Sequence, residues 1–295
     1  MIPIQKTGTL DLDIVESNPI VFRGKPWLME YVRLHQTNGP SRSYYGNTLG
    51  QPYCRFRSLE DCQTFSEPFG IGYCFGNAFA DHDHLAVTVT EYWGSPSFLL
   101  LESDDMVHWT EPRPIYENPA KRCYNSSLCK AGDKYINALE VGDIEDCLHN
   151  YMIFIESTDL KNWRLIQGAY APNGAPLLRF HDGWYFYICL IGDYDKGFNT
   201  CIFRSRDLKE WEAGPHNPIL PFDENDRKIH PQARLTPAQL QNIATAVNIN
   251  ASDMDMCEYN GKVIVSYSWG DQKGHEFLAL GQANATERDF CFSWF

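Results

Sequence analysis

The chain has 295 residues, of which 43% are hydrophobic and 14% aromatic, enough to build a sizeable core. Its formal net charge is −13 and it contains no basic run, which argues against nucleic acid and anionic membrane surfaces as partners. No stretch approaches the ~18 consecutive apolar residues of a membrane span. The N-terminal residues MIPIQKTGTLDLDIV alternate like a strand and lack the apolar core of a signal peptide.

Strand-like runs joined by short turns recur along the whole chain. Two turn dipeptides, Asp182-Gly183 and Asn260-Gly261, are strong hairpin signals. The predicted runs are residues 19–22 and 27–33, then 76–79 and 85–91, 125–129 and 135–141, 176–180 and 184–191, and finally 252–259, 262–269 and 276–283. This succession indicates an all-β fold built from repeated hairpins.

A short motif follows several of these hairpins. The pattern S-x-D-[LM]-x-x-W begins at Ser103, Ser157 and Ser205, and a degenerate copy begins at Ser58. Its aspartates lie at positions 61, 105, 159 and 207, a spacing that suits one four-stranded propeller blade per copy. Ser and Asp side chains can accept backbone N–H bonds in the turn, while the Trp packs between sheets.

The repeat predicts one domain over residues 1–295, a five-bladed β-propeller with four-stranded blades. The outer strand of the last blade could come from residues 290–295 or from residues 9–15. Two segments are longer than the connections that a four-stranded blade needs: a polar loop at residues 34–50 and an insertion at residues 221–247. In the insertion, Thr236-Pro237-Ala238-Gln239 predicts a capped short helix over about residues 237–246. Either segment could carry function or be surface decoration.

Ten cysteines are scattered through the chain, and no two are spaced C-x-x-C. A disulfide scaffold is typical of short secreted chains, and a zinc site needs clustered ligands. We therefore expect most thiols to be reduced and the protein to be cytoplasmic.

These motifs resemble the five-bladed propeller glycosidases, the group that contains glycoside hydrolase families 43, 32, 62 and 117. The resemblance rests on the blade motif, on Asn18-Pro19-Ile20-Val21-Phe22, and on Asn250-Ala251-Ser252-Asp253-Met254-Asp255 followed by Tyr267-Ser268-Trp269-Gly270-Asp271-Gln272, which looks most like family 117 and its unassigned relatives. It implies a carbohydrate bound in the axial funnel and hydrolysed by paired acids. It implies no cofactor with certainty and leaves open a divalent metal such as calcium in the axial channel.

The chain departs from the family pattern at one expected position. Families 43 and 32 are expected to place an Asp base on the first strand of the first blade, where this chain reads Ser17-Asn18-Pro19-Ile20. The first strand of the second blade offers Asn77 instead of a carboxylate. The usual catalytic set is therefore not transferred to this chain.

Candidate acids are sought on the innermost strands and their neighbours, because those strands approach the axis. Asp253 and Asp255 lie two residues apart on the first strand of the fifth blade. Asp253 is the catalytic candidate, with a turn or hydrogen-bonding role as its alternative. Asp255 sits deeper and is a second catalytic candidate, with a structural tie, a metal ligand or substrate binding as its alternatives. Glu140 and Glu30 each end an apolar run on comparable strands of the third and first blades. Resemblance to family 43 favours Glu140 as the general acid, and pairing with Arg33 is the alternative for Glu30.

Residues near these acids complete the predicted site. His275 stands where related propellers place a metal-binding or acid histidine, and Trp93 and Trp269 could stack on a sugar ring or pack in the core. The predicted substrate-binding residues are Arg33, Asn77, Asn125, Asp255, Trp269, Gln272 and His275, and no metal ligand is assigned.

The leading functional hypothesis is an intracellular, exo-acting glycoside hydrolase that cleaves a small neutral oligosaccharide with inversion. Glu140 and Asp253 are its predicted catalytic pair, and Glu30 is the third catalytic candidate. One alternative is a glycoside phosphorylase, with phosphate held by His230, Arg234 and Arg33. The other is a non-catalytic carbohydrate-binding propeller. A small oligosaccharide is the expected partner, and the sequence leaves a homo-oligomer open.

Overall fold

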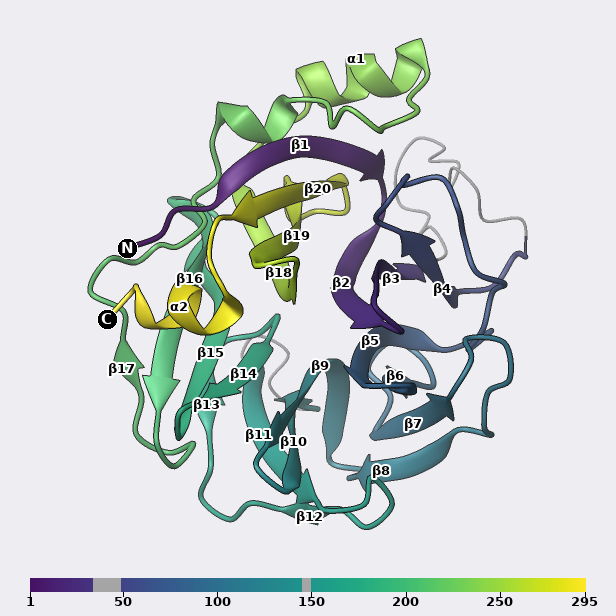
Figure 1. Ribbon diagram of the computed structural model, residues 1–295, viewed down its shortest axis with the longest axis vertical. Coiled ribbons are helices and arrows are strands. Elements are labelled where there is room, and N and C mark those ends of the chain that lie inside the picture. The colour runs from purple at the N-terminus through teal and green to yellow at the C-terminus, as the bar shows by residue number, and fades with distance from the viewer. Residues whose placement is uncertain (34–48, 145–149) are drawn as a thin grey trace.

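The computed structural model describes residues 1–33, 49–144 and 150–295, and its strands are arranged in a ring around a central axis (Figure 1). The described strands form four sheets. The first has the order β2-β3-β4: β2 (Val15–Phe22), β3 (Lys25–Val32) and β4 (Tyr53–Ser58). The second has the order β5-β6-β7-β8: β5 (Cys74–Asp81), β6 (His84–Thr90), β7 (Ser97–Ser103) and β8 (Arg113–Glu117).

The third sheet has the order β12-β11-β10-β9, with a short β13 also paired to β11. Its strands are β9 (Lys121–Ala131), β10 (Lys134–Asp143), β11 (Asn150–Ser157), β12 (Arg164–Leu165) and β13 (Ala171–Pro172). The fourth sheet combines two antiparallel groups that a single parallel pair, Phe198 opposite Asn250, joins. One group is β14 (Leu177–His181), β15 (Trp184–Asp193), β16 (Gly197–Ser205) and β17 (Glu212–Ala213); the other is β18 (Asn250–Tyr259), β19 (Lys262–Gly270), β20 (Glu276–Ala283) and β1 (Gln5–Leu12).

The first strand of each successive group lies nearest the centre of the ring, as Figure 1 shows for β2, β5, β9, β14 and β18. The predicted hairpins are all present, and their turns have the expected geometry. At Asp182-Gly183 and Asn260-Gly261 all four residues have positive φ, between 49° and 77°. Left-handed φ at both central residues matches the twist of the flanking strands.

The repeated motif has the local structure that its residues predict. Ser103 Oγ accepts the backbone N–H groups of Asp105 and Met106, and the Asp105 carboxylate accepts those of Val107 and His108. All four bonds recur in the copy that begins at Ser205, and three of them recur in the copy that begins at Ser157. The motif thus closes the turn after the third strand of a group with its own side chains.

The three motif tryptophans occupy comparable places between neighbouring sheets. Trp109 packs on the core shared by β2–β4 and β5–β7 and stacks on Phe69 with ring centroids 3.9 Å apart. Trp163 and Trp211 pack on the next two inter-sheet cores around the ring. Each tryptophan therefore contributes to the packing of one sheet against the next.

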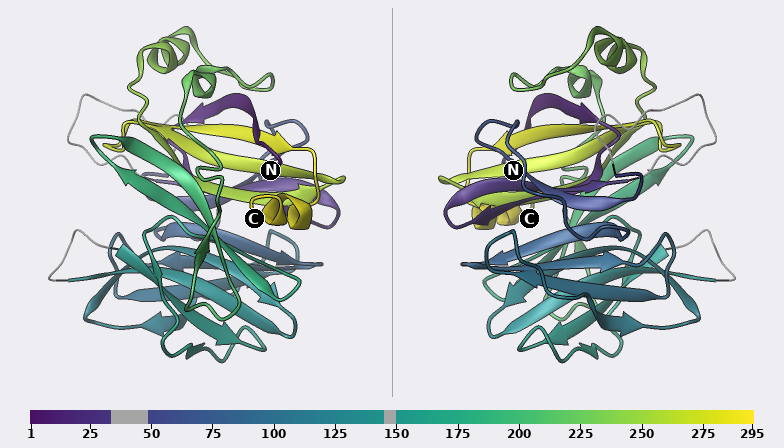
Figure 2. Two further views of the ribbon diagram at one scale, coloured as in Figure 1. Left: turned by 90° about the vertical axis from the view of Figure 1, so that its left-hand side faces the viewer. Right: turned by 90° about the vertical axis from the view of Figure 1, so that its right-hand side faces the viewer.

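The outer strand beside β20 comes from the N-terminus, which decides between the two predicted sources. Strand β1 pairs antiparallel with β20, whereas the C-terminal residues form the helix α2 (Glu287–Phe292). The two termini lie near each other in every view of Figures 1 and 2, and the Ile2 amide donates to Ser293 Oγ at 3.0 Å. None of the helices in the described ranges is long and apolar enough to span a membrane.

The predicted helix in the insertion is present as α1 (Pro237–Thr245), with the capping box between Thr236 and Gln239. It follows a 3₁₀ turn, η1 (Glu224–Arg227), and both lie outside β1 in Figures 1 and 2. The predicted polar loop at 34–50 falls, apart from residues 49 and 50, outside the described residues.

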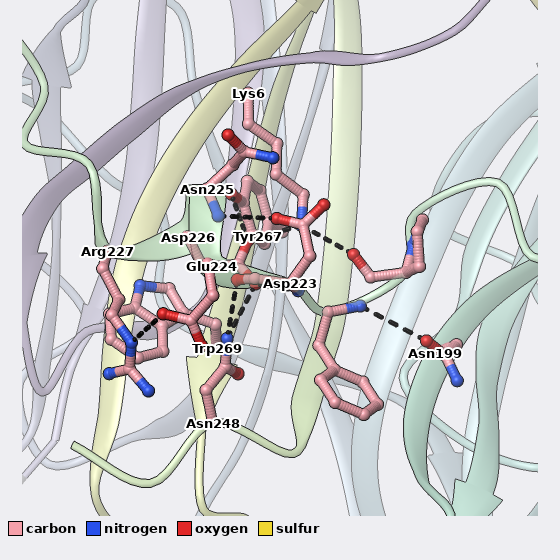
Figure 3. Close-up of polar contacts among 12 residues, drawn as sticks. Lys6, Asn199, Asp223, Glu224, Asn225, Asp226, Arg227, Asn248, Tyr267 and Trp269 are labelled. Atoms are coloured by element: carbon pink, nitrogen blue, oxygen red, sulfur yellow. Dashed lines mark hydrogen bonds and ion pairs between the residues drawn. The ribbon is translucent and has the colours of Figure 1, made fainter.

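A buried carboxylate fastens this insertion to the sheet (Figure 3). The side chain of Asp226 is wholly buried and lies 2.6 Å from Lys6 Nζ, and Tyr267 Oη donates to it at 2.9 Å. The backbone of Asp226 accepts from Thr9 Oγ1, which in turn accepts from Trp269 Nε1. These bonds hold β1, β19 and the insertion in one unit.

We expect Asp226→Asn to lower the free energy of unfolding by about 1–3 kcal/mol, because it removes the closest anion from the nearly buried Lys6 ammonium. Asp223, 3.3 Å from the same ammonium, limits the loss. Denaturant titration measures the change. Asp133→Asn, at an exposed turn, serves as control, and equal stability of the two variants would contradict the role of Asp226.

Candidate active site

A small polar pocket lies where the innermost strands converge. Its lining comes from the first half of β2 and β5, the middle of β9 and β18, and the loop before β14: Glu16, Ser17, Phe75, Gly76, Asn77, Asn125, Ser126, Ala175, Pro176, Asp253, Met254 and Asp255. The free space is about 20 Å³, close to what one water molecule needs. We call this space the axial pocket.

A repeated backbone irregularity turns side chains toward the axial pocket. Glu16, Phe75, Ala175 and Asp253 all have positive φ, between 49° and 55°, a conformation that non-glycine residues seldom adopt. In three of these cases the strand register shifts at that residue, between Val15 and Asn18 and at the corresponding places of β5 and β18. Such bulges re-aim side chains beside functional sites.

Glu16 is a site residue that the sequence reasoning missed. Its Oε2 is buried and has no hydrogen-bond partner in the described part of the chain. Burial raises the pKa of Glu16 well above its usual value, and the charge of Asp253 raises it further. The predicted first strand began at Pro19, but β2 begins at Val15 and carries Glu16 on its bulge. Glu16 therefore lies close to where family 43 was expected to place its base.

Asp253, predicted as catalytic, lines the axial pocket next to Glu16. Burial raises the pKa of Asp253 to about 7, and the negative charges of Glu276 and Glu140 add to the increase. A hydrogen bond that Ser252 Oγ donates at 2.6 Å lowers the pKa of Asp253 and so opposes this increase. Asp253 thus changes its charge near neutral pH, which suits acid–base chemistry.

The Ser252 hydroxyl is itself oriented by two amides. Asn250 Nδ2 and Gln272 Nε2 both donate to Ser252 Oγ, at 3.0 and 3.2 Å. With its lone pairs engaged, the hydroxyl directs its proton to Asp253. Gln272, predicted to bind substrate, therefore also acts on Asp253 through this chain.

Glu140, the predicted general acid, lies behind the lining and is 5% exposed. Its carboxylate accepts three N–H groups, from Asn125 Nδ2 at 2.9 Å, Asn150 Nδ2 at 2.7 Å and the Ala175 amide at 3.1 Å. Gly174 lets the loop approach this closely, because a Cβ there would stand 2.3 Å from Glu140 Oε1. These three donors fix the position of the carboxylate.

Glu276 brings a further carboxylate to the cluster, where Arg33 Nη2 donates to its Oε2 at 2.9 Å. Arg33 also lowers the pKa values of Glu16 and Asp253. Among the described residues whose charges act on Glu16 and Asp253, there are therefore more carboxylates than arginines.

Asp255 and Asn77, both predicted for the site, line the axial pocket at its base. Asp255 Oδ1 lies 2.6 Å from Arg179 Nη2 and accepts the Met256 amide, while Asn77 Nδ2 donates to Oδ2 at 3.4 Å. Burial raises the pKa of Asp255, and Arg179 opposes the rise. Asp255 is thus held in place by a buried ion pair.

The structure corrects the assignment of Glu30. Its carboxylate is wholly buried between Arg55, at 2.7 Å, and Arg57, at 2.5 Å, and it does not line the axial pocket. Burial by itself would raise the pKa of Glu30, but the two arginines lower it. Arg57 also contacts Asp11 on β1, so this ion-pair group helps to close the ring.

Trp269 is likewise not a sugar-binding residue. Its ring is wholly buried, stacks on Phe277 with centroids 4.3 Å apart, and donates to Thr9. His275 is about half exposed on the β19–β20 loop, with Nδ1 fixed 2.6 Å from Asp271 Oδ2. His275 therefore stays an oriented imidazole beside Glu276, the next residue along the chain.

Within the described residues, no three His, Cys, Asp or Glu side chains are grouped so as to hold a metal ion. The acids of the axial pocket instead face amide, hydroxyl and guanidinium donors.

We expect Asp253 to make stability depend on pH. Its pKa is about 7 in the folded protein and close to 4 when unfolded, so its contribution is present below pH 4 and is lost as the pH rises through 7. Asp253→Asn should therefore exceed the wild type in unfolding free energy at pH 8 by roughly 2–4 kcal/mol and match it closely at pH 4. Urea titrations at both pH values measure this, and a pH-independent difference would contradict it.

Comparisons with known proteins concern the fold. No protein-family model matches the sequence, and a search of curated proteins also gives no match. Among solved structures, the catalytic domain of a family 62 α-L-arabinofuranosidase from Coprinopsis cinerea is similar with a TM-score of 0.64 and 13% identity, covering 96% of this chain and 97% of that one.

Two further structures agree. An α-L-arabinofuranosidase from Podospora anserina, in complex with cellotriose, gives a TM-score of 0.61 at 11% identity, covering 95% of this chain and 92% of that one. An α-L-arabinanase from Penicillium chrysogenum, complexed with arabinobiose, gives 0.53 at 9% identity, covering 88% and 71%. This chain therefore has the fold of the β-propeller glycoside hydrolases.

Proposed function

We propose that the protein is a glycoside hydrolase, a single five-bladed propeller domain that acts on the ends of small neutral oligosaccharides with inversion. One observation carries the proposal: two acids with raised pKa values, Glu16 and Asp253, line the same axial pocket from opposite ends of the sequence. Glycoside hydrolysis generally uses two carboxyl groups on either side of the scissile bond.

The order of ionisation assigns the roles. Asp253, with a pKa of about 7, gives up its proton first and acts as the base. Glu16 keeps its proton beside the charged Asp253 and acts as the acid. Asp253 takes a proton from water as the water oxygen bonds to the anomeric carbon. The glycosidic C–O bond breaks, and Glu16 protonates the leaving oxygen.

Glu140 has a third role in this proposal. Its three N–H donors fix the carboxylate behind the pocket lining, so it is poorly placed to protonate a leaving oxygen. A fixed anion next to the axial pocket stabilises the positive charge that develops on the sugar in an oxocarbenium-like transition state. Glu16 thus replaces Glu140 as the proposed acid.

Charge and shape support a neutral chain end as substrate. The acids at the site would repel a uronic acid. The axial pocket has room for about one water molecule, so the sugar ring lies at its mouth, where a chain end fits better than the middle of a polymer. Glu16 Oε2 and Ser126 Oγ are buried without a partner in the described part of the protein, so sugar hydroxyls could satisfy them. Two similar structures hold neutral oligosaccharides, arabinobiose and cellotriose.

Sugar release from a panel of nitrophenyl glycosides and neutral oligosaccharides, with and without phosphate, tests the proposal. We expect phosphate-independent hydrolysis of at least one neutral glycoside. Turnover that requires phosphate would make the protein a phosphorylase, and binding without turnover would make it a carbohydrate-binding propeller.

We also propose a cytoplasmic location. The nine cysteines within the described residues are all free and buried, which suits a reducing compartment, and Cys147 lies outside these residues. Subcellular fractionation of the source cells tests this proposal.

A further inference from the structure

A half-exposed tryptophan stands beside the axial pocket on a support of two other aromatic rings. Trp93 is 53% exposed. Its ring centroid lies 4.8 Å from that of Phe75 and 6.0 Å from that of Tyr124. Phe75 and Tyr124 also contact each other edge to face, with centroids 5.9 Å apart. We call these three residues the Trp93 platform.

The Trp93 platform adjoins the axial pocket through Phe75, which is 2% exposed and lines that pocket. Trp93 follows β6, which ends at Thr90 directly opposite Cys74, the residue before Phe75. The loop that carries Trp93 therefore lies at the same end of the sheet as the pocket. Tyr124, at the start of β9, brings in the neighbouring sheet.

The indole is held in place rather than free to turn away. Its ring rests on Phe75 and Tyr124, and the backbone of Trp93 hydrogen-bonds to the Cys74 thiol. The Arg122 side chain covers the next residue, Gly94, where an added Cβ would lie 3.6–3.7 Å from it. A rigid, half-exposed indole loses little conformational entropy when it binds a ligand.

We propose that the Trp93 platform binds a second sugar ring of a neutral oligosaccharide whose terminal sugar lies at the mouth of the axial pocket. An aromatic face packs against the apolar C–H face of a sugar, while the sugar hydroxyls stay in water. The axial pocket has room for about one water molecule, so the sugar rings of an oligosaccharide lie outside it and extend across its rim. Trp93 contacts Phe75, which lines the pocket, so the platform directly adjoins the pocket lining. The inference rests on the proposed function and specifies the substrate as an oligosaccharide of at least two units.

The test uses the full-length protein and xylo-, arabino-, cello- and manno-oligosaccharides of two to four units. Calorimetry measures binding to the wild type, to Trp93→Ala and to the control Tyr170→Ala, whose ring is 49% exposed beside Tyr151. For each series that binds the wild type, we expect Trp93→Ala to weaken binding by about fivefold to tenfold. The control should bind as the wild type does.

A second readout follows the indole itself. Oligosaccharide binding should change the tryptophan emission of the wild type, and Trp93→Phe should abolish that change while keeping an aromatic ring. Equal affinities of wild type and Trp93→Ala, or no binding by any series, would overturn the inference. Tight binding that depends on Trp93 without sugar release would instead refute the proposed hydrolysis and leave the platform standing.

Discussion

Glu16→Gln and Asp253→Asn should each lower glycoside turnover by a factor of about 10² or more, because each removes one proton-transfer group from the axial pocket. Both substitutions keep the shape of the side chain. The exposed Glu111→Gln serves as control and should retain full turnover. Steady-state kinetics on the substrate found in the release assay measures the effect.

The pH profiles distinguish the two acids. Wild-type kcat/KM should rise with pH as Asp253 ionises near pH 7, then fall at higher pH as Glu16 loses its proton. Asp253→Asn should lose the rising limb and Glu16→Gln the falling limb. Near-normal turnover of Glu16→Gln would return the role of acid to Glu140, and near-normal turnover of Asp253→Asn would refute its role as the base. NMR of the first-formed anomer shows whether the configuration inverts.

Glu30→Gln should lower the free energy of unfolding by about 3–5 kcal/mol, because it leaves Arg55 and the buried Arg57 without their shared anion. A surface ion pair provides the matched control. Arg288 and Asp182 are 2.6 Å apart and about half exposed, so Arg288→Ala should leave the free energy of unfolding almost unchanged.

This prediction also separates structure from catalysis at Glu30. Folded Glu30→Gln protein, assayed well below its unfolding midpoint, should retain turnover within about threefold, since Glu30 does not line the axial pocket. A hundredfold loss of turnover with unchanged stability would restore the catalytic role that the sequence suggested.

The sequence predicted the repeated architecture because that architecture is encoded locally. Ser103 and Asp105 satisfy the backbone of their own turn, and Asn260-Gly261 fixes a hairpin through its own φ preferences. The capping box of α1 could also be predicted from the sequence, since the side chains of Thr236 and Gln239 each accept the backbone N–H of the other within one turn. Contacts this short in sequence can be predicted without knowing the fold.

The site was only partly predictable. Asp253 and Asn77 stand on innermost strands, so the strand pattern was enough to locate them. Glu16 was missed because a bulge, invisible in the hydrophobic pattern, extends β2 and turns this residue inward. Glu30 and Glu140 look alike in sequence, each an acid ending an apolar run, yet their partners differ: two arginines hold Glu30, while amide donors hold Glu140 beside the pocket.

The sequence by itself determined the strands, turns and repeat of this protein, because short-range hydrogen bonds and side-chain periodicity specify them. Only the tertiary structure decided which strand completes the last sheet, that Trp269 packs in the core, and which acids share a pocket. Those outcomes depend on contacts between residues more than 200 positions apart, such as Glu16 with Asp253 and Thr9 with Trp269. The physical reason is that burial and neighbouring charge set the role of a carboxyl group, and both arise only when the ring closes.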